Sequence, residues 1–379
     1  MASSLRTACG VAVVADQNSP LVLERGGLLE HVEIAWESYG QLNPERSNAI
    51  LVCHALTGNQ RAAGEEGWWG EVIGSGRAID TDRWFVICSN VLGGRDGSTG
   101  PCSLNPAQGE PFGADFPEIT LRDMVRAQRL LLDRLGVLRL ASVVGGSMGA
   151  MQTLQWCIEY PDDLDSAVAI AAGGAHSAWS IAFNSIAREA IALGQSGGDG
   201  EAGLRLARAI AMISYRGDRS FAERFGRRGG GAGREFAVQE WLDHHGQRLA
   251  ARFDADTYVT LTQAMDAYDL GPLSALHRGV RADLLTVGIS SDVLYPSHEV
   301  RRVAEAVPGA RYAEIESPHG HDAFLIEFDQ LGALLHGFLE RRGCQAPSPV
   351  LHDRGLERVD GRSVYTHHRL SSSEATPCV

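Results

Sequence analysis

The stretch VVGGSMGAMQTLQW, from Val143 to Trp156, places a serine between glycines where a β-branched run gives way to a helical pattern. In a strand, tight turn and helix of the form Gly-x-Ser-x-Gly, the serine hydroxyl is held out as a nucleophile. A glycine-rich turn without a catalytic role would have a similar sequence. Ser147 is therefore a candidate nucleophile only if the chain also supplies a base, an acid and an oxyanion hole.

Short runs rich in Val and Ile alternate with longer amphipathic segments along much of the chain. This pattern predicts an α/β fold, with a mostly parallel sheet and helices on both faces. Residues 120–136 have Leu and Met at helical spacing, begin with a threonine cap and end at Gly136, so they predict a crossover helix. The predicted strands lie within residues 31–40, 48–56, 83–93, 140–147, 165–173, 282–290 and 310–317.

The strand pattern is interrupted between residues 176 and 278, which read as helices broken by glycine-rich loops. Connections between sheet strands usually span about 2–6 residues, so we expect an inserted helical lid over the carboxyl edge of the sheet. A second, unrelated domain is the alternative. The core is then expected in two parts, residues 19–175 and 279–342, and residues 343–379 are expected to form a disordered tail.

The remaining members of a catalytic triad are present at the same predicted edge. Asp292 follows one predicted strand, and His319 and His321 share the loop after the next. A serine becomes a nucleophile when a histidine takes its proton and a carboxylate orients that histidine. The order Ser, Asp, His is the one expected of the α/β-hydrolase fold. The residues alone do not distinguish His319 from His321 as the base.

An oxyanion hole of this fold uses two backbone N–H groups. Met148, directly after the candidate nucleophile, supplies one. The segment VCHALTGNQ follows an early predicted strand and places the amide of Leu56 where it can supply the other. An ordinary strand-to-loop turn is the competing interpretation of this segment.

Composition narrows the class of protein. A formal net charge of −13 without a basic patch argues against nucleic-acid binding. The N-terminal apolar run is too weak to favour a signal peptide, and no run approaches the roughly 18 apolar residues of a membrane span. Seven cysteines without a C-x-x-C pair favour reduced thiols in a cytoplasmic protein. His367 and His368 lack partners at metal-ligand spacing, so no metal site is expected.

Ten blocks between residues 19 and 339 occur in the order found in the homoserine O-acetyltransferase family, which the sequence therefore resembles. These are α/β-hydrolase-fold enzymes of methionine biosynthesis. The blocks are CHALTG, GWW, DTDRWFVICSNVLGG, GSTGP, DFPEITLRDMVRAQRLLLDRLG, VVGGSMG, ISYRGDRSFAERFGR, RFDADTYVTLTQAMDAYDL, SSDVLYP and GHDAFLIE.

By position, the resemblance implies that Ser147 is the nucleophile, Asp292 the orienting acid and His321 the base. It also implies that Arg216 and Asp322 hold the amino-acid substrate. A zwitterion needs a cation for its carboxylate and an anion for its ammonium group, so these two residue types suit that role.

The reaction implied is transfer of an acetyl group from acetyl-CoA to the side-chain hydroxyl of L-homoserine through an acyl-serine. No other cofactor is expected, and the resemblance implies a cytoplasmic homodimer. Succinyl-CoA as donor, L-serine as acceptor and hydrolysis of small esters are the alternatives. The choice of donor and acceptor depends on a few side chains of the pocket, and transfer differs from hydrolysis in that water must be excluded.

Two positions depart from the family pattern. Ala150 stands where the family usually has a glycine, and we expect its methyl group to be tolerated. Arg95 stands where a small residue or cysteine is more usual. If Arg95 faces the acyl pocket, it would suit a succinyl carboxylate; in an acetyl-specific enzyme it should be turned away or neutralised by a neighbour such as Asp96.

Overall fold

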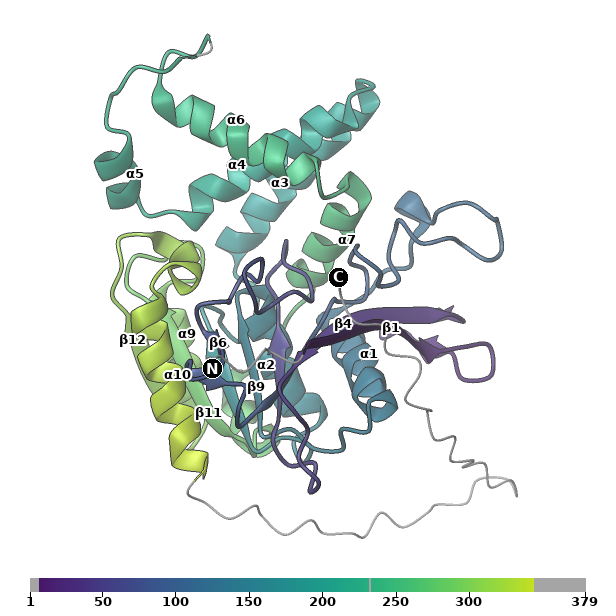
Figure 1. The fold of residues 1–379 in the computed structure, drawn as a ribbon. Helices are drawn as coiled ribbons and strands as arrows, with labels where there is room; N and C mark the ends of the chain where they lie inside the picture. The colour runs from purple at the N-terminus through teal and green to yellow at the C-terminus, as the bar shows by residue number, and fades with distance from the viewer. Residues whose placement is uncertain (1–6, 232, 344–379) are drawn as a thin grey trace.

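The computed structural model describes residues 7–231 and 233–343, and an eight-stranded sheet forms its centre (Figure 1). Strand β4 is antiparallel to both of its neighbours, and the other neighbouring strands pair in parallel. The sheet is therefore mostly parallel, as predicted. Its strands, in spatial order, are β1 (Thr7–Ala15), β4 (Val32–Tyr39), β8 (Phe85–Ser89), β5 (Ala49–Cys53), β9 (Ser142–Gly146), β10 (Ser166–Ile170), β11 (Asp283–Ile289) and β12 (Arg311–Ile315).

Strand β1 was not predicted, and it begins ahead of residue 19, where the core was expected to start. The other seven strands confirm the Val- and Ile-rich runs. As an edge strand β1 pairs only with β4, and its Val11 and Val13 are exposed. Its mixture of small and exposed apolar residues therefore lacks the continuous hydrophobic signal of a buried strand.

Alternate side chains of the central strands enter two cores, because successive residues of a strand point to opposite faces. Val143 and Ala167 belong to one core, and Val144 and Val168 belong to the other. The second core is covered by residues 62–79 and α10 (Phe328–Gly343). Helices that contribute to the first core outside the predicted insertion are α1 (Leu121–Arg134), α2 (Met148–Glu159) and α9 (Ser297–Ala306), and α8 (Leu273–Gly279) joins them from the end of that insertion.

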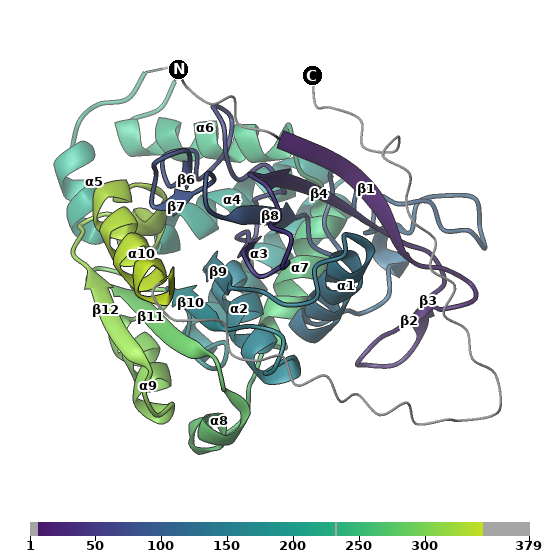
Figure 2. The same ribbon diagram turned by 60° about the horizontal axis from the view of Figure 1, so that its bottom comes forward.

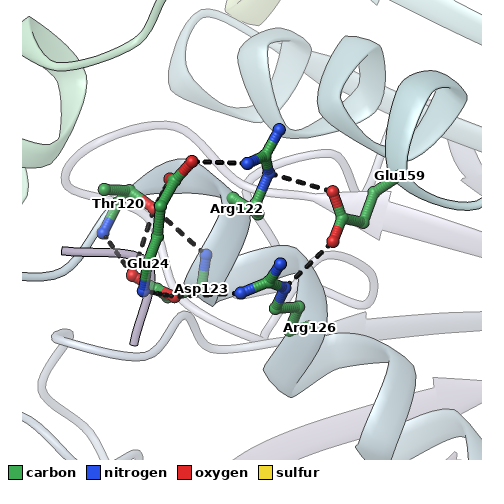
Figure 3. A network of polar contacts seen from close by, with 6 residues as sticks. All are labelled: Glu24, Thr120, Arg122, Asp123, Arg126 and Glu159. Carbon is green, nitrogen blue, oxygen red and sulfur yellow. Dashed lines mark hydrogen bonds and ion pairs between the residues drawn. The ribbon is translucent and has the colours of Figure 1, made fainter. Parts of the chain in front are cut away.

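The predicted crossover helix is α1, and its first turn is tied to two other parts of the core (Figure 3). Thr120 is the N-cap and forms a reciprocal capping box with Asp123. The backbone N–H of Glu24 also donates to Asp123, at 2.9 Å. Arg126 donates to Glu159 at the end of α2, at 2.9 Å. These contacts fix α1 beside the helix that follows the candidate nucleophile.

In the described part of the predicted insertion, five of the six helices stand above the carboxyl edge of the sheet, and we refer to them as the lid (Figure 1). The sixth helix of that segment, α8, packs instead against α2 and α9, and Figure 2 shows it beside α9, away from α3, α4 and α6. The chain thus returns to the core before residue 279. The lid helices are α3 (Ala178–Ser196), α4 (Gly200–Tyr215), α5 (Asp218–Arg224), α6 (Ala237–Ala250) and α7 (Ala255–Asp266).

Short elements complete the described chain. They are β2 (Leu21–Val22), β3 (Leu28–Leu29), β6 (Ile73–Gly74), β7 (Ile79–Asp80) and the 3-10 helices η1 (Gly113–Asp115) and η2 (Gly320–Leu325). None of the described helices has the length and hydrophobicity needed to cross a bilayer. The predicted tail lies outside the described residues beyond residue 343.

The cysteines follow the expectation of reduced thiols only in part. Cys53, Cys88, Cys102 and Cys157 are free. Cys9 is disulfide-bonded, which that expectation did not include.

Candidate active site

Ser147 occupies the sharp turn between β9 and α2. Its φ of 59° and ψ of −125° lie in a region that side-chain-bearing residues rarely adopt. Its backbone N–H donates to the carbonyl of Ile170 at 2.9 Å, which fixes the turn to the neighbouring strand. The strained conformation holds the hydroxyl out at the carboxyl end of β9.

The glycines of the turn are required by close packing. A Cβ at Gly145 would lie 2.3 Å from the carbonyl oxygen of Gly149, and one at Gly149 would lie 2.1 Å from that of Cys53. A Cβ at Gly146 would lie 2.6 Å from the ring of Phe324. Ala150, by contrast, is fully buried in the core beneath α2, so the fold accommodates its methyl group.

The structure brings Ser147, His321 and Asp292 together in the predicted arrangement. Nε2 of His321 lies 2.8 Å from Oγ of Ser147, and Nδ1 lies 2.7 Å from Oδ2 of Asp292. All three residues are buried. With Nδ1–H donating to the carboxylate, Nε2 is free to accept the serine proton.

Asp292 is held in place by backbone donors. It follows β11, and its Oδ1 accepts the N–H groups of Leu294 at 2.8 Å and Tyr295 at 2.9 Å. Oδ2 is left for His321. This division of the two oxygens orients the carboxylate toward the imidazole.

The two candidate histidines have different neighbours. The ring of His321 lies among those of Tyr215, Tyr295 and Phe324, with centroids 5.6, 5.0 and 5.7 Å away. Nδ1 of His319 lies 3.2 Å from the hydroxyl of Ser220 on α5. Of the two histidines, His321 is therefore the one in contact with the candidate nucleophile.

Both candidate oxyanion donors lie close to this turn. Met148 is the first residue of α2, so its N–H has no partner within the helix. Leu56 is the second residue of a turn over residues 55–58, whose closing hydrogen bond does not use its N–H. The tight contact of Gly149 with Cys53 packs the start of α2 against the end of β5, a few residues before Leu56.

Arg216 and Asp322, predicted to hold a substrate, form an ion pair beside His321. Nε of Arg216 lies 3.1 Å from Oδ2 of Asp322 but is buried without a hydrogen bond. Asp322 accepts no hydrogen bond from any described residue. Burial raises the pKa of its carboxyl, and the cations Arg216 and Arg208 oppose that rise. The pair thus retains hydrogen-bonding capacity for a ligand.

Arg95 is half-buried in the loop after β8. Its positive charge lowers the pKa of the Cys102 thiol, an effect outweighed by burial, which raises that pKa to about 11. Among the described residues Arg95 forms no ion pair with Asp96, and the expectation that Arg95 is turned away from the acyl pocket or neutralised by a neighbour stays a prediction. Within the described part of the chain, no hydrogen bond or ion pair joins Arg95 to Ser147, His321 or Asp292.

The aromatic and polar groups that support His321 could not be identified from the sequence. Tyr295 lies in the block SSDVLYP, yet nothing in its spacing shows that its ring contacts His321. Its hydroxyl lies 3.0 Å from Nε2 of His176, and Nδ1 of His176 lies 3.0 Å from Asp266. No sequence motif connects residues so far apart. Among the described residues, no group of three metal-binding side chains is found.

A buried Ser–His–Asp chain at the carboxyl edge of such a sheet defines a serine-nucleophile protein of the α/β-hydrolase fold. A family model described as the alpha/beta hydrolase fold matches residues 48–214. The chain is 46% identical to homoserine O-acetyltransferase of Moorella thermoacetica, over 84% of this chain and 93% of that one. The chain belongs to the homoserine O-acetyltransferase family.

Solved structures show the same architecture. A homoserine O-acetyltransferase from Bacillus anthracis is 27% identical, with a TM-score of 0.81 over 88% of this chain and 98% of that one. The esterase E22 is 25% identical, with a TM-score of 0.81 over 88% of this chain and 100% of that one. Both a transferase and an esterase thus have structures similar to that of this chain.

Proposed function

We propose that this protein transfers an acetyl group from acetyl-CoA to the side-chain hydroxyl of L-homoserine. The observation that carries the proposal is the position of the Arg216–Asp322 pair beside the buried Ser147–His321 contact. A simple esterase needs the serine and histidine but has no need of a paired cation and anion next to them. The family relationship supports the same reaction.

In the first half-reaction, Oγ of Ser147 attacks the thioester carbonyl while Nε2 of His321 accepts its proton. The N–H groups of Leu56 and Met148 stabilise the oxyanion. As the tetrahedral intermediate collapses, the carbon–sulfur bond breaks and the CoA thiolate takes the proton from His321. Asp292 stabilises the imidazolium that exists between these two transfers. An acetyl-serine remains.

In the second half-reaction, the carboxylate of homoserine binds Arg216 and its ammonium group binds Asp322. These two substrate groups share one carbon atom, which suits a cation and an anion that lie 3.1 Å apart. His321 then removes the proton from the homoserine hydroxyl, which attacks the acetyl-serine. The new ester departs and Ser147 regains its proton.

The lid helices give this site a means of favouring transfer over hydrolysis. Tyr215 and Arg216 end α4, so the lid itself contributes residues to the site. Covering the acyl-serine excludes water, which competes with the acceptor hydroxyl.

Hydrolysis of small acetyl esters is the second candidate, favoured by the similarity to esterase E22. Incubation of purified protein with acetyl-CoA or succinyl-CoA, each with L-homoserine, L-serine or no acceptor, separates the possibilities. We expect acetyl-CoA with homoserine to release thiol fastest and to form O-acetylhomoserine, identified by mass. Equal thiol release without an acceptor would support hydrolysis, and a strong preference for succinyl-CoA would change the assigned donor.

A homodimer is part of this proposal, and the lid supplies a surface for it. Five large apolar side chains of α3 and α4 are 51–65% exposed and recur at seven-residue spacing. Such a stripe on paired helices is typical of packing against further helices. A second copy of the chain would cover it symmetrically. The five side chains are Trp179, Ile186, Leu193, Leu206 and Ile213.

The chemistry proposed needs acetyl-CoA as a co-substrate and no resident cofactor or metal. The cytoplasmic location stays a prediction, and fractionation of cells that express the protein would test it.

A further inference from the structure

The two ends of the lid meet at one place on the core. Ala175, just before α3, and Asp269, just after α7, form an isolated antiparallel bridge. Beside this bridge, the backbone N–H of His176 donates to the carbonyl oxygen of Tyr268 at 2.9 Å. The chain therefore enters and leaves the lid through a single paired junction.

A buried carboxylate joins the two ends more firmly. Asp266 is the last residue of α7, and its Oδ1 lies 3.0 Å from Nδ1 of His176 and accepts the side-chain amide of Asn184 at 2.8 Å. Its Oδ2 accepts Nη2 of Arg188 at 2.6 Å. We call these four residues the lid root. The side chains of Asp266 and His176 are only 15% and 1% exposed, so water does little to weaken these charged contacts.

The start of the lid is also bound to the segment that follows the acid of the triad. Oγ of Ser180 on α3 donates to the carbonyl oxygen of Leu294 at 2.8 Å, and Nε2 of His176 lies 3.0 Å from the hydroxyl of Tyr295. The backbone N–H groups of Leu294 and Tyr295 are the two donors to Asp292. The lid and the acid of the triad are therefore fixed to the same two residues.

The position of α3 affects the cover over the base. Helix α3 packs against α4, and α4 ends in Tyr215, whose ring lies 5.6 Å from that of His321. A displacement of α3 at the lid root would therefore move the part of the lid that covers His321. Exclusion of water from the acyl-serine depends on how closely this cover fits.

We propose that the lid root, with Asp266 as its positioning residue, determines how much of the acetyl group passes to homoserine and how much passes to water. This inference rests on the proposed function. Both acceptors react in the same way: the attacking oxygen loses its proton to His321, a carbon–oxygen bond forms, and the ester bond to Oγ of Ser147 breaks as the proton returns to that oxygen. Since the chemistry is shared, access to the acyl-serine decides between the two acceptors.

Asp266→Asn tests the lid root. The amide oxygen can still accept from His176, but the amide NH₂ group would then face Nη2 of Arg188, so that two donors oppose each other. O-acetylhomoserine and acetate are both measured with acetyl-CoA and saturating homoserine. We expect the ratio of acetate to O-acetylhomoserine to rise about tenfold, because a charge-assisted hydrogen bond is lost. Both products come from one acyl-serine, so a loss of folded protein does not alter this ratio.

Ser180→Ala is a milder second variant that removes a single hydroxyl, and it should raise the ratio about threefold. Asp243→Asn is the matched control. Asp243 lies on α6 and pairs with Arg234 at 2.6 Å, outside the lid root, so its substitution should leave the ratio unchanged. Ratios equal to that of the wild type in both Asp266→Asn and Ser180→Ala would overturn the inference.

Decay of the isolated acetyl-enzyme in water alone provides a second measurement. We expect it to be about tenfold faster in Asp266→Asn than in the wild type, for the same reason. Equal decay rates would count against the lid root. A wild type that forms the acetyl-enzyme but no O-acetylhomoserine would refute the proposed function, whereas the comparison of decay rates would still test the lid root.

Discussion

Tyr295 connects two His–Asp pairs. Its ring lies 5.0 Å from that of His321, and its backbone N–H donates to Asp292 at 2.9 Å. Its hydroxyl lies 3.0 Å from Nε2 of His176, whose Nδ1 is 3.0 Å from Asp266. If Nδ1–H of His176 donates to the carboxylate, Nε2 accepts the tyrosine proton. The second pair therefore positions the residue that supports the first.

Replacing Tyr295 by Phe tests this support. The ring remains, but the hydrogen bond to His176 is lost, a change worth about 1–2 kcal/mol for a buried pair. We expect kcat to fall about threefold to tenfold with KM for acetyl-CoA nearly unchanged. Tyr312→Phe is the control, since that hydroxyl bonds Glu314 on β12. A kcat within twofold of wild type for Tyr295→Phe would show that the hydroxyl has no positioning role.

The triad assignment predicts a distinct ranking of single variants. Ser147→Ala and His321→Ala should each lower kcat by at least about 10³-fold, because members of a triad act as a unit. His319→Ala should cost far less, since Nδ1 of His319 contacts Ser220 of α5 and not the nucleophile. Steady-state kinetics on folded protein, checked by circular dichroism, measures the ranking. The reverse order for the two histidines would refute the assignment.

Arg216→Ala should separate the two half-reactions. The variant should still release a burst of CoA and form the acyl-serine, whereas use of homoserine should weaken by roughly 2–5 kcal/mol through loss of a charged hydrogen bond. Rapid-quench measurement of the burst, followed by decay of the acyl-enzyme with and without homoserine, checks this. Loss of the burst itself would show that Arg216 acts in the half-reaction with acetyl-CoA or in the structure of the lid.

Protonation of Asp322 should make the reaction with homoserine sensitive to acid. Burial raises the pKa of its carboxyl above the ordinary value of 3.8, so its anion is lost as pH falls through a higher value than usual. An uncharged Asp322 cannot hold the ammonium group of homoserine. We expect the ratio of kcat/KM for homoserine to the rate constant of acyl-enzyme formation to decrease as pH falls.

The ratio is used because both half-reactions depend on the same base, His321, so its contribution cancels. In Asp322→Asn the ratio should be lower than in wild type near neutral pH and should vary little with pH. A wild-type ratio that is flat down to about pH 4 would contradict the role given to Asp322.

Leu193→Glu should produce monomers if the exposed stripe of α3 and α4 is the dimer interface. A buried, unpaired charge in each copy opposes association. Leu138→Glu is the matched control, because Leu138 is similarly exposed but lies outside the lid. Sedimentation at several concentrations distinguishes the two variants. A wild-type protein that sediments as a monomer would remove the homodimer from the proposal.

Much of the core could be predicted from local patterns. Seven strands, the capped crossover helix and the Gly-x-Ser-x-Gly turn depend on residues within one short segment, so alternation, capping and glycine placement identify them. The edge strand β1 escaped prediction because its pairing partner, β4, lies elsewhere in the chain and its own residues are small or exposed. The return of α8 to the core likewise depends on contacts with α2 and α9.

In the candidate site, the chemistry of Ser147 and Asp292 follows from their place after predicted strands, whereas the residue types alone left His319 and His321 equivalent. The three-dimensional fold distinguishes them, because only Nε2 of His321 lies within 2.8 Å of the Ser147 hydroxyl in the described structure. The support of Tyr295 by His176 is also invisible in the linear order. Local patterns specify elements because their causes are short-range; side-chain contacts between distant segments exist only once the sheet and the lid have packed.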